Sequence, residues 1–568
     1  MTISNSNKYT LGIYNSNTAG VALFRGGELI YASSEERFTR TKQQSGMPIN
    51  ALFDMVKYSG VHLDQIYDVA YGGYNYPNIE SIRDYIDFAI TKKNTKIAER
   101  IENSLRVDAQ YLRDFCLNVK ALLPKADISF VDHHESHAFA AYAFAGKKEI
   151  NILTADGRGD LQSSAIWRAN EAGLTRHKTF CEFKSLGFFY GQITKALGFV
   201  PYRHEGKITG LAAIGKRTDL VEKLKEYICF KNGDICVSDN FQPFNRPDDM
   251  NWLLSAIDSY TKEDVAFAAQ NVLEETVLNL IEYYFSKDLP LAVAGGIFGN
   301  VKLNQRIRES NLVNGLYVFP EMSDGGLCVG AAACLIAKNN SLKVFGAESK
   351  SSFYYHVPNM YLGNFVEWNY DYTNLNLKKI SFENKENFLD AVVQKLIENN
   401  LVGVVSGRME FGPRALGGRS IIFSAVGGLS SDLVNQRFDR TEFMPFAPVT
   451  LKSQAKNMYP DYKDSDVNVN YMTICYNCSD EMRKLTPLVV HVDNTARPQI
   501  IDENHPNKVY YQILNAYYLE TGVPTLVNTS FNRHEEPIVC TSLDALKALK
   551  DGLVDLVIND KYEIYIKE

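Results

Sequence analysis

Three histidines fall within five positions of the stretch VDHHESHAFAAY at residues 131–142, in a chain with only ten histidines. If this stretch is helical, His133 and His137 lie four residues apart and share one face. That spacing suits two ligands of one metal ion, whereas His134 points about 100° away. The order HHESH does not match the H-E-x-x-H pattern of zinc proteases. The alternative is that these histidines cap a helix or lie in a core with their hydrogen bonds satisfied.

Two aspartates elsewhere are candidates to complete such a site. Two imidazoles do not fill the coordination sphere of a metal, and a hard cation would also require carboxylates. Asp156 in TADGRGD and Asp324 in SDGG both lie in glycine-containing loops that follow expected strands. They are therefore the predicted carboxylate ligands.

Glycine-rich loops suggest a nucleotide. LPLAVAGGIFGN reads as a strand that ends in Gly295 and Gly296 and then opens into a helix. Backbone N–H groups at such a helix start can approach a phosphate. Together with NSNTAG and DGRGD, this loop is similar to the phosphate and adenosine loops of an actin-like ATPase core.

Arginines beside glycines mark the C-terminal part of the chain. Guanidinium groups next to exposed backbone suit a phosphate or a carboxyl phosphate. Ordinary surface ion pairs are the alternative, although a Gly-Pro-Arg loop is an unusual place for one. The candidates are Arg408, Arg414 and Arg419 in GRMEFGPRALGGRS, Arg437 and Arg440 in NQRFDRTEF, and Arg497 in HVDNTARPQ.

The 568 residues are too many for one core and predict at least two domains. Residues 338–365 are polar and aperiodic, which predicts domains at 1–350 and 351–568. The expected strands are 11–14, 20–24 and 28–32. The expected helices are 50–58, 78–122, the alanine-rich run after the histidines, and 387–399.

Composition excludes several classes of partner. The net charge of −7 without blocks of like charge argues against nucleic acid and against an anionic membrane surface. Apolar runs are too short for a membrane span, and the N-terminus has no secretory signal, so we expect a cytoplasmic protein. The nine scattered cysteines fit free thiols in a reducing compartment, and CYNC at 475–478 is weak evidence for zinc.

In this order, the motifs resemble those of the O-carbamoyltransferases of antibiotic and nodulation-factor biosynthesis. The resemblance runs from residue 10 to about 560, and its most specific stretches are GRMEFGPRALGG and TGVPTLVNTSFN. The other matching stretches are ASSEERFTRTK, HHESHAFAAYAF, ADGRGD, EGKITGLAAIG, AGGIFGNVKLNQRI, PFAP and HVDNTARPQ.

The resemblance implies an α/β protein with two domains and two reactions. A C-terminal YrdC-like domain with a twisted sheet would make carbamoyl adenylate from carbamoyl phosphate and ATP. An N-terminal actin-like domain, similar to the tRNA threonylcarbamoyl-transferase, would pass the carbamoyl group to a small-molecule acceptor, a natural-product intermediate. Iron is the metal that the resemblance implies, although the ligands alone would also admit Mn or Mg. A homodimer is compatible with this assignment.

The resemblance also assigns residues. The metal ligands fall on His133, His137 and Asp156, with Asp324 in the matching aspartate loop. The expected contacts to nucleotide or carbamoyl adenylate are Lys42, Lys207, Gly295, Gly296, Asn300 and Asp324. The expected carbamoyl-phosphate residues are Arg414, Arg497, Asn528 and Ser530, with Arg440 as the nearest substitute for an arginine that this chain replaces by Met444.

One departure concerns the chemistry itself. The family carries a histidine, the expected general base, where this chain has Asn17, and an amide cannot accept a proton at neutral pH. The first interpretation is an active carbamoyltransferase whose acceptor is an amine, amidine or guanidine, or one that uses a substrate carboxylate or His204. The alternatives are an O-carbamoyltransferase with a relocated base, an impaired binding or regulatory homologue, and a metal-dependent hydrolase.

Overall fold

The computed structural model describes residues 8–73, 79–92, 96–170, 173–241, 250–339, 357–370, 372–428, 431–439 and 446–568. They form two compact units: the first lies within 1–32 and 45–358, and the second within 33–44 and 359–568. The boundary expected after residue 350 falls outside the described residues. The sequence did not indicate that Ser33–Gln44 belongs to the second unit.

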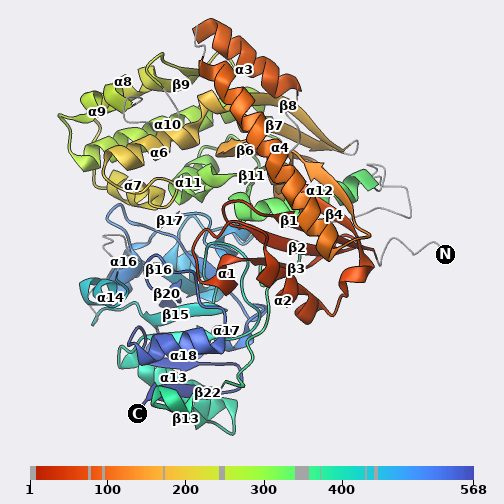
Figure 1. The fold of residues 1–568 in the computed structure, drawn as a ribbon. Helices are drawn as coiled ribbons and strands as arrows, with labels where there is room; N and C mark the ends of the chain where they lie inside the picture. The colour runs from red at the N-terminus through yellow and green to blue at the C-terminus, as the bar shows by residue number, and fades with distance from the viewer. Residues whose placement is uncertain are drawn as a thin grey trace. The chain divides into compact units, whose positions relative to one another are not determined.

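The first unit contains two five-stranded sheets with the same topology (Figure 1). In each sheet, the first strand along the chain pairs antiparallel with the second and parallel with the fourth. One sheet has the order β3-β2-β1-β4-β5, with bounds Glu28–Ser34, Gly20–Arg25, Tyr9–Tyr14, Ile66–Gly72 and Asp127–Val131. The other has the order β12-β11-β6-β7-β8, with bounds Leu316–Val318, Leu291–Ala294, Ile150–Gly159, Gln162–Asn170 and Gly173–Cys181.

The repeated sheet confirms the α/β class and agrees with the actin-like architecture expected for this part of the chain. The expected N-terminal strands are β1, β2 and β3. The expected helical stretches are also present, and the stretch expected at 78–122 contains two helices, α3 and α4. The helices of this unit are α2 Ile49–Ser59, α3 Ile79–Lys92, α4 Lys96–Leu122, α5 His133–Ala145, α6 Leu186–Ala196, α7 Glu205–Ala212, α8 Leu220–Tyr227, α9 Asn251–Ile257, α10 Lys262–Tyr284, α11 Val301–Glu309 and α12 Leu327–Asn339. A hairpin of β9 Ile228–Lys231 and β10 Asp234–Val237 follows α8.

Helices α5 and α12 pack directly against each other. The approach is so close that a Cβ atom on Gly330 would lie 1.7 Å from the carbonyl oxygen of Ser136, so only glycine fits there. Helix α5 is alanine-rich, as the sequence predicted, and Asp132 caps its N-terminus by accepting the Glu135 N–H at 2.9 Å. This packing fixes the helix that carries the histidines.

The second unit is built on an eight-stranded mixed sheet whose core lies against α13 and α17. No helix among the described residues is long and apolar enough to cross a membrane. The sheet order is β13-β22-β21-β14-β15-β20-β16-β19, with bounds Leu377–Ser381, Glu563–Lys567, Leu556–Ile558, Val402–Val405, Arg419–Ser424, Thr525–Ser530, Ala447–Leu451 and Gln499–Ile501. The other elements are α1 Glu36–Thr39, α13 Lys385–Ile397, α14 Ser431–Arg437, α15 Ala455–Met458, α16 Asp480–Leu485, α17 Lys508–Thr521, α18 Ser542–Lys550, β17 Tyr476–Asn477 and β18 Thr495–Ala496.

Candidate metal centre and anion site

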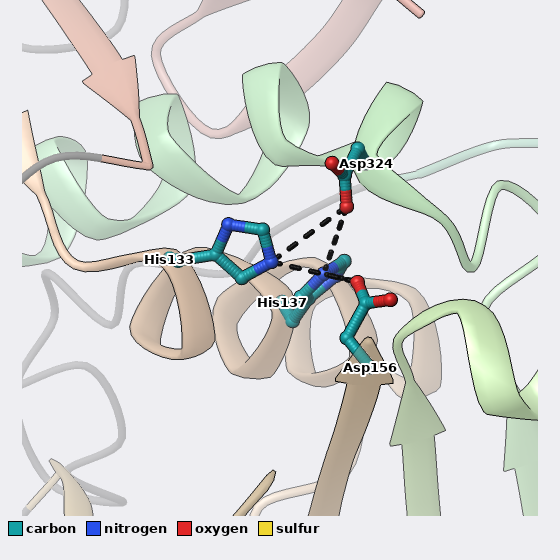
Figure 2. Close-up of side chains that lie close together, drawn as sticks. All are labelled: His133, His137, Asp156 and Asp324. Atoms are coloured by element: carbon teal, nitrogen blue, oxygen red, sulfur yellow. Dashed lines mark hydrogen bonds and ion pairs between the residues drawn. The ribbon is translucent and has the colours of Figure 1, made fainter. Parts of the chain in front are cut away.

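Four side chains converge in the first unit, and they are the four predicted from the sequence. His133 and His137 project from successive turns of α5, Asp156 lies within β6, and Asp324 begins the short helical turn before α12 (Figure 2). The Nε2 atom of His137 lies 3.1 Å from Asp156 Oδ2 and 3.8 Å from Asp324 Oδ1. The Nε2 atom of His133 lies 3.5 and 3.6 Å from the same two oxygens.

These separations fit a metal ion. Ligands held about 2.1 Å from a common cation lie roughly 3.0 to 3.8 Å from one another for ligand–metal–ligand angles of about 90° to 130°. The four atoms lie within 4.8 Å of each other and comprise two nitrogens and two oxygens, a set that iron, manganese or zinc accepts. Without a cation, two carboxylates would face each other in a buried place at a high electrostatic cost. The donor set therefore fits the predicted metal.

Hydrogen bonds orient both carboxylates. The Gly157 N–H donates to Asp156 Oδ1 at 2.6 Å, and the Tyr14 hydroxyl donates to Asp324 Oδ2 at 2.8 Å. Each aspartate thus has one oxygen held by the protein and the other turned toward the imidazoles. Such outer contacts fix the orientation of metal ligands and tune their basicity. Tyr14 carried no signal in the sequence, because a tyrosine at a strand end is ordinarily a core residue.

The backbone around His133 is equally constrained. Its N–H donates to Asp160 Oδ2 at 2.7 Å, which fixes the first residue of α5. A Cβ atom on Gly159 would lie 2.0 Å from Cγ of His133, so this glycine leaves room for the imidazole. His134 points elsewhere: its Nδ1 contacts Thr154 Oγ1 at 3.0 Å, and burial lowers its pKa well below the usual value. Asp160 and Gly159 belong to the ADGRGD motif, but their contacts require the fold.

The electrostatics of the cluster depend on its burial. Burial alone would lower the pKa of His133, but the charges of Asp324 and Asp156 raise it to about 9. Burial, and then the negative charge of Asp156, raise the pKa of Asp324 to about 7. Burial raises the pKa of Asp156 as well, but hydrogen bonds from both imidazoles hold it well below its usual value. Without a metal, the cluster therefore retains protons that a cation would displace.

One side of the cluster is open. The side chains of His133 and His137 are 4% and 0% exposed, whereas those of Asp156 and Asp324 are 15% and 26% exposed. A cation held here would be closed off by the imidazoles and accessible from the carboxylate side. An accessible coordination position is typical of catalytic rather than structural metal sites.

The expected nucleotide loop lies against this open side. Gly295 has a φ of +108°, and a Cβ atom on it would lie 2.0 Å from the carbonyl oxygen of Ala155. A Cβ atom on Gly296 would lie 3.0 Å from Asp156 Oδ1. Asn300 caps α11 by accepting the Leu303 N–H at 3.0 Å. The two glycines therefore bring the end of β11 beside the aspartate, while Asn300 begins the following helix.

The remaining candidates of the first unit are more scattered. Asn17 is exposed in the loop between β1 and β2, and its neighbour Thr18 lies beside Gly325 in the Asp324 loop. Lys207 is buried in α7, with its Nζ 5.8 Å from the centre of the Phe199 ring. His204 precedes α7, and its Nδ1 accepts the backbone N–H of Val200 at 3.2 Å. Lys42 belongs to the second unit.

In the second unit, hydrogen bonds join the segments that carry the predicted carbamoyl-phosphate residues. The Asn528 Nδ2 donates to Gln499 Oε1 at 2.8 Å and to the carbonyl oxygen of Ala415 at 3.0 Å. Gln499 follows Arg497 by two residues, and Ala415 follows Arg414. Ser530 pairs with Ser420 across β15 and β20. The loops of Arg414 and Arg497 are thus held beside β20, the strand that carries Asn528 and Ser530.

Three other arginines have structural roles. The guanidinium of Arg408 donates to the carbonyl oxygens of Gly363 and Leu362. Arg419 is fully buried and donates to backbone carbonyl oxygens, and Arg437 forms an ion pair with Asp555 at 3.0 Å. Most of their donors already bind protein oxygens, which argues against the anion binding that the sequence suggested for these three side chains. Arg440 lies outside the described residues.

Comparison with known proteins places this geometry in context. Residues 10–334 match the family model described as Carbamoyltransferase N-terminus, and residues 393–565 match Carbamoyltransferase C-terminus. The uncharacterized protein MJ1051 of Methanocaldococcus jannaschii is 29% identical over 98% of this chain and 99% of its own length. Nodulation protein NolNO of Sinorhizobium fredii is 29% identical over 94% of this chain and 77% of its own length. A crystal structure of full-length HypF in its phosphate- and nucleotide-bound form has a TM-score of 0.32 and 13% identity, covering 60% of this chain and 56% of that chain.

Replacing His137 by Ala should remove bound metal while leaving the fold intact. The substitution deletes one of four ligands and leaves only the imidazole of His133 between Asp156 and Asp324. We expect the metal affinity to fall by more than about 100-fold, since losing even an outer contact of a ligand costs about 10- to 100-fold. Metal content measured by mass spectrometry after gel filtration checks this. His177→Ala, at an exposed position on β8, is the control, and equal metal content in both variants would contradict the site.

Metal affinity should rise with pH. Binding requires the neutral imidazole of His133, whose pKa is about 9, and the carboxylate of Asp324, whose pKa is about 7. Between about pH 7 and pH 9 one proton is displaced, so affinity should increase about tenfold per pH unit, and more steeply below about pH 7. Calorimetric titration in buffers of different ionisation enthalpy measures the proton release. A constant affinity from about pH 6 to pH 9 would refute this assignment.

Proposed function

Because the chain belongs to the carbamoyltransferase family, we propose that it makes carbamoyl adenylate from carbamoyl phosphate and ATP and transfers the carbamoyl group to a small-molecule acceptor. The observation that carries the proposal is the convergence of His133, His137, Asp156 and Asp324 into a cluster open on its carboxylate side. A separate set of joined loops with arginines lies in the second unit. Two sites of different chemistry suit two successive reactions.

Adenylate formation is assigned to the second unit. The Arg414 and Arg497 guanidiniums would neutralise the phosphate of carbamoyl phosphate, and Ser530 would donate a hydrogen bond. The loop of Arg414 is prepared for this, because the Leu416 N–H donates to Glu410 Oε1 at 2.8 Å, which helps to fix the loop before a ligand arrives. Water hydrolyses carbamoyl phosphate to carbamate and phosphate. A carbamate oxygen then bonds to the α-phosphorus of ATP, and the bond from that phosphorus to pyrophosphate breaks. A rigid, positively charged loop favours that exchange by holding both reactants.

Carbamoyl transfer is assigned to the first unit. A metal held by the cluster would neutralise the phosphate charge that develops as AMP leaves. Gly295 and Gly296 allow the backbone of the nucleotide loop to come close to Asp156, which supports binding of an adenylate beside the cluster. The Tyr14 hydroxyl holds Asp324 in its orientation. The acceptor forms a bond to the carbonyl carbon, and the bond from that carbon to the phosphate oxygen breaks.

The acceptor is proposed to be a nitrogen nucleophile. Asn17 cannot take a proton from a hydroxyl group at neutral pH, and it occupies the loop beside Asp324. An amine attacks through its own lone pair and loses its proton after the bond has formed, so it needs no base beforehand. His204 is a poor substitute base, because the lone pair of its Nδ1 already accepts the Val200 N–H. O-carbamoylation with a base elsewhere is the second candidate.

The two reactions should be separable by mutation. We expect the wild-type protein to release pyrophosphate from ATP only when carbamoyl phosphate is present. Arg414→Ala should slow this release about 10- to 100-fold, the effect of losing a charge-assisted hydrogen bond. His133→Ala should keep pyrophosphate release and reduce carbamoylated product by more than about 100-fold. A coupled pyrophosphate assay and mass spectrometry of acceptor mixtures measure the two steps.

The controls are chosen to distinguish failures of the two steps. His177→Ala should behave as wild type in both assays. If both substrates together yield no pyrophosphate, the adenylate proposal is wrong. If His133→Ala abolishes pyrophosphate release as well, the cluster serves the fold or both steps, and its assignment to transfer alone is contradicted.

A further inference from the structure

We propose that Cys229 and Cys236 form a redox-active dithiol that closes into a disulfide across the β9–β10 hairpin. The two residues are direct partners in the antiparallel register, so their side chains lie on the same face of the hairpin. Cα atoms of directly opposed residues are about 4.5 to 5.5 Å apart in either kind of rung. Disulfides span Cα separations of about 4.4 to 6.8 Å, so the bond requires no shift of the backbone.

The turn of the hairpin fixes this register. Asn232 and Gly233 have φ values of 54° and 78°, the left-handed conformation at both central positions of a type I′ turn. The Asn-Gly pair is the strongest sequence signal for such a two-residue hairpin. Slipping by one residue would move one cysteine to the other face, and the turn prevents that. The pairing of the two thiols therefore follows from the turn.

The two thiols are more accessible than six of the other seven cysteines, and the seventh, Cys116, is partly exposed on α4. Cys236 is exposed and Cys229 partly exposed, whereas Cys181, Cys328, Cys334, Cys475, Cys478 and Cys540 are buried. The hairpin cysteines also line an open hollow of about 400 Å³, together with Glu222 and Lys225 of α8. A small oxidant such as hydrogen peroxide or a low-molecular-weight disulfide can enter such a space. Burial raises the pKa of Cys229, and a charge on Cys236 raises it further.

The reaction balances with a disulfide of a small thiol as oxidant. The thiolate of Cys236 attacks that disulfide, forms a mixed disulfide and expels one small thiolate. The sulfur of Cys229 then loses its proton, attacks Cys236 and expels the second small thiolate. Two S–H bonds are lost, one S–S bond forms, and the oxidant takes up two electrons and two protons. Excess small thiol reverses both steps.

The closed hairpin would be anchored beside α10. Lys225 of α8 forms an ion pair with Glu275 of α10 at 2.7 Å, and β9 itself packs on α10. A disulfide between the strands closes an eight-residue loop within this anchored segment. We therefore expect oxidation to slow amide exchange of residues 228–237 without unfolding the first unit.

A tryptic digest under non-reducing conditions tests the proposal directly, because trypsin cuts after Lys231, between the two cysteines. The native protein, treated with oxidised glutathione and then alkylated, should yield peptide 226–231 linked to peptide 232–262. The link should form in most molecules and disappear after treatment with excess dithiothreitol. If no linked peptide forms, and Cys229 and Cys236 each carry only an alkyl or a glutathionyl group, the proposal is wrong.

Two variants make the result specific. Cys236→Ser, at an exposed position, should abolish the linked peptide and leave Cys229 reduced, whereas Cys116→Ser, at the partly exposed cysteine of α4, should leave the link unchanged. A link that persists in Cys236→Ser through another cysteine would contradict the pairing. Amide exchange of oxidised and reduced wild type provides a second measurement, and equal protection of residues 228–237 in both forms would contradict the closure.

Discussion

Two carboxylates, Asp156 and Asp324, each direct one oxygen into a largely buried space, open on one side, that they share with two imidazoles. Their mutual repulsion is the constraint on which the surrounding structure depends, because buried like charges must be neutralised by protons or by a cation. The pKa of Asp324 rises to about 7 and that of His133 to about 9, so both groups retain protons that offset this repulsion. The Tyr14 hydroxyl holds Oδ2 of Asp324 and the Gly157 N–H holds Oδ1 of Asp156. The other oxygen of each carboxylate therefore faces the imidazoles.

The framework around the cluster explains why its elements come so close. Gly330 lets α12 approach α5 within backbone contact, and α12 follows the turn that carries Asp324. Gly159 leaves space for the imidazole of His133.

In the second unit, arginine side chains bind backbone carbonyl oxygens that are distant in the sequence. Arg37 donates to the carbonyl oxygen of Gly412, and Arg40 donates to that of Ile538. The ERFTR stretch thus anchors its own segment in the second unit, beside the loop that leads to Arg414.

The sequence predicted the ligand set because its signals were local or carried by whole motifs. The four-residue spacing of His133 and His137 required only a helix, and neighbouring glycines marked Asp156 and Asp324. Asp156 nevertheless lies within β6 and not, as the sequence had suggested, in a loop after it. The role of Tyr14 could not be predicted, since it depends on a contact between residues 310 positions apart. The sequence could not distinguish the roles of Arg408, Arg419 and Arg437 for a related reason. An arginine that binds protein oxygens and one that binds an anion look the same in the sequence. The placement of Ser33–Gln44 in the second unit likewise depends on tertiary contacts.

An anomalous diffraction measurement on crystals of the metal-loaded protein tests the central claim most directly. Data collected above and below the absorption edge of the bound metal locate that metal independently of activity. We predict a single strong peak within about 2.0 to 2.3 Å of the Nε2 atoms of His133 and His137 and of one oxygen each of Asp156 and Asp324. A peak elsewhere, with the four side chains still bonded directly to one another, would contradict the account.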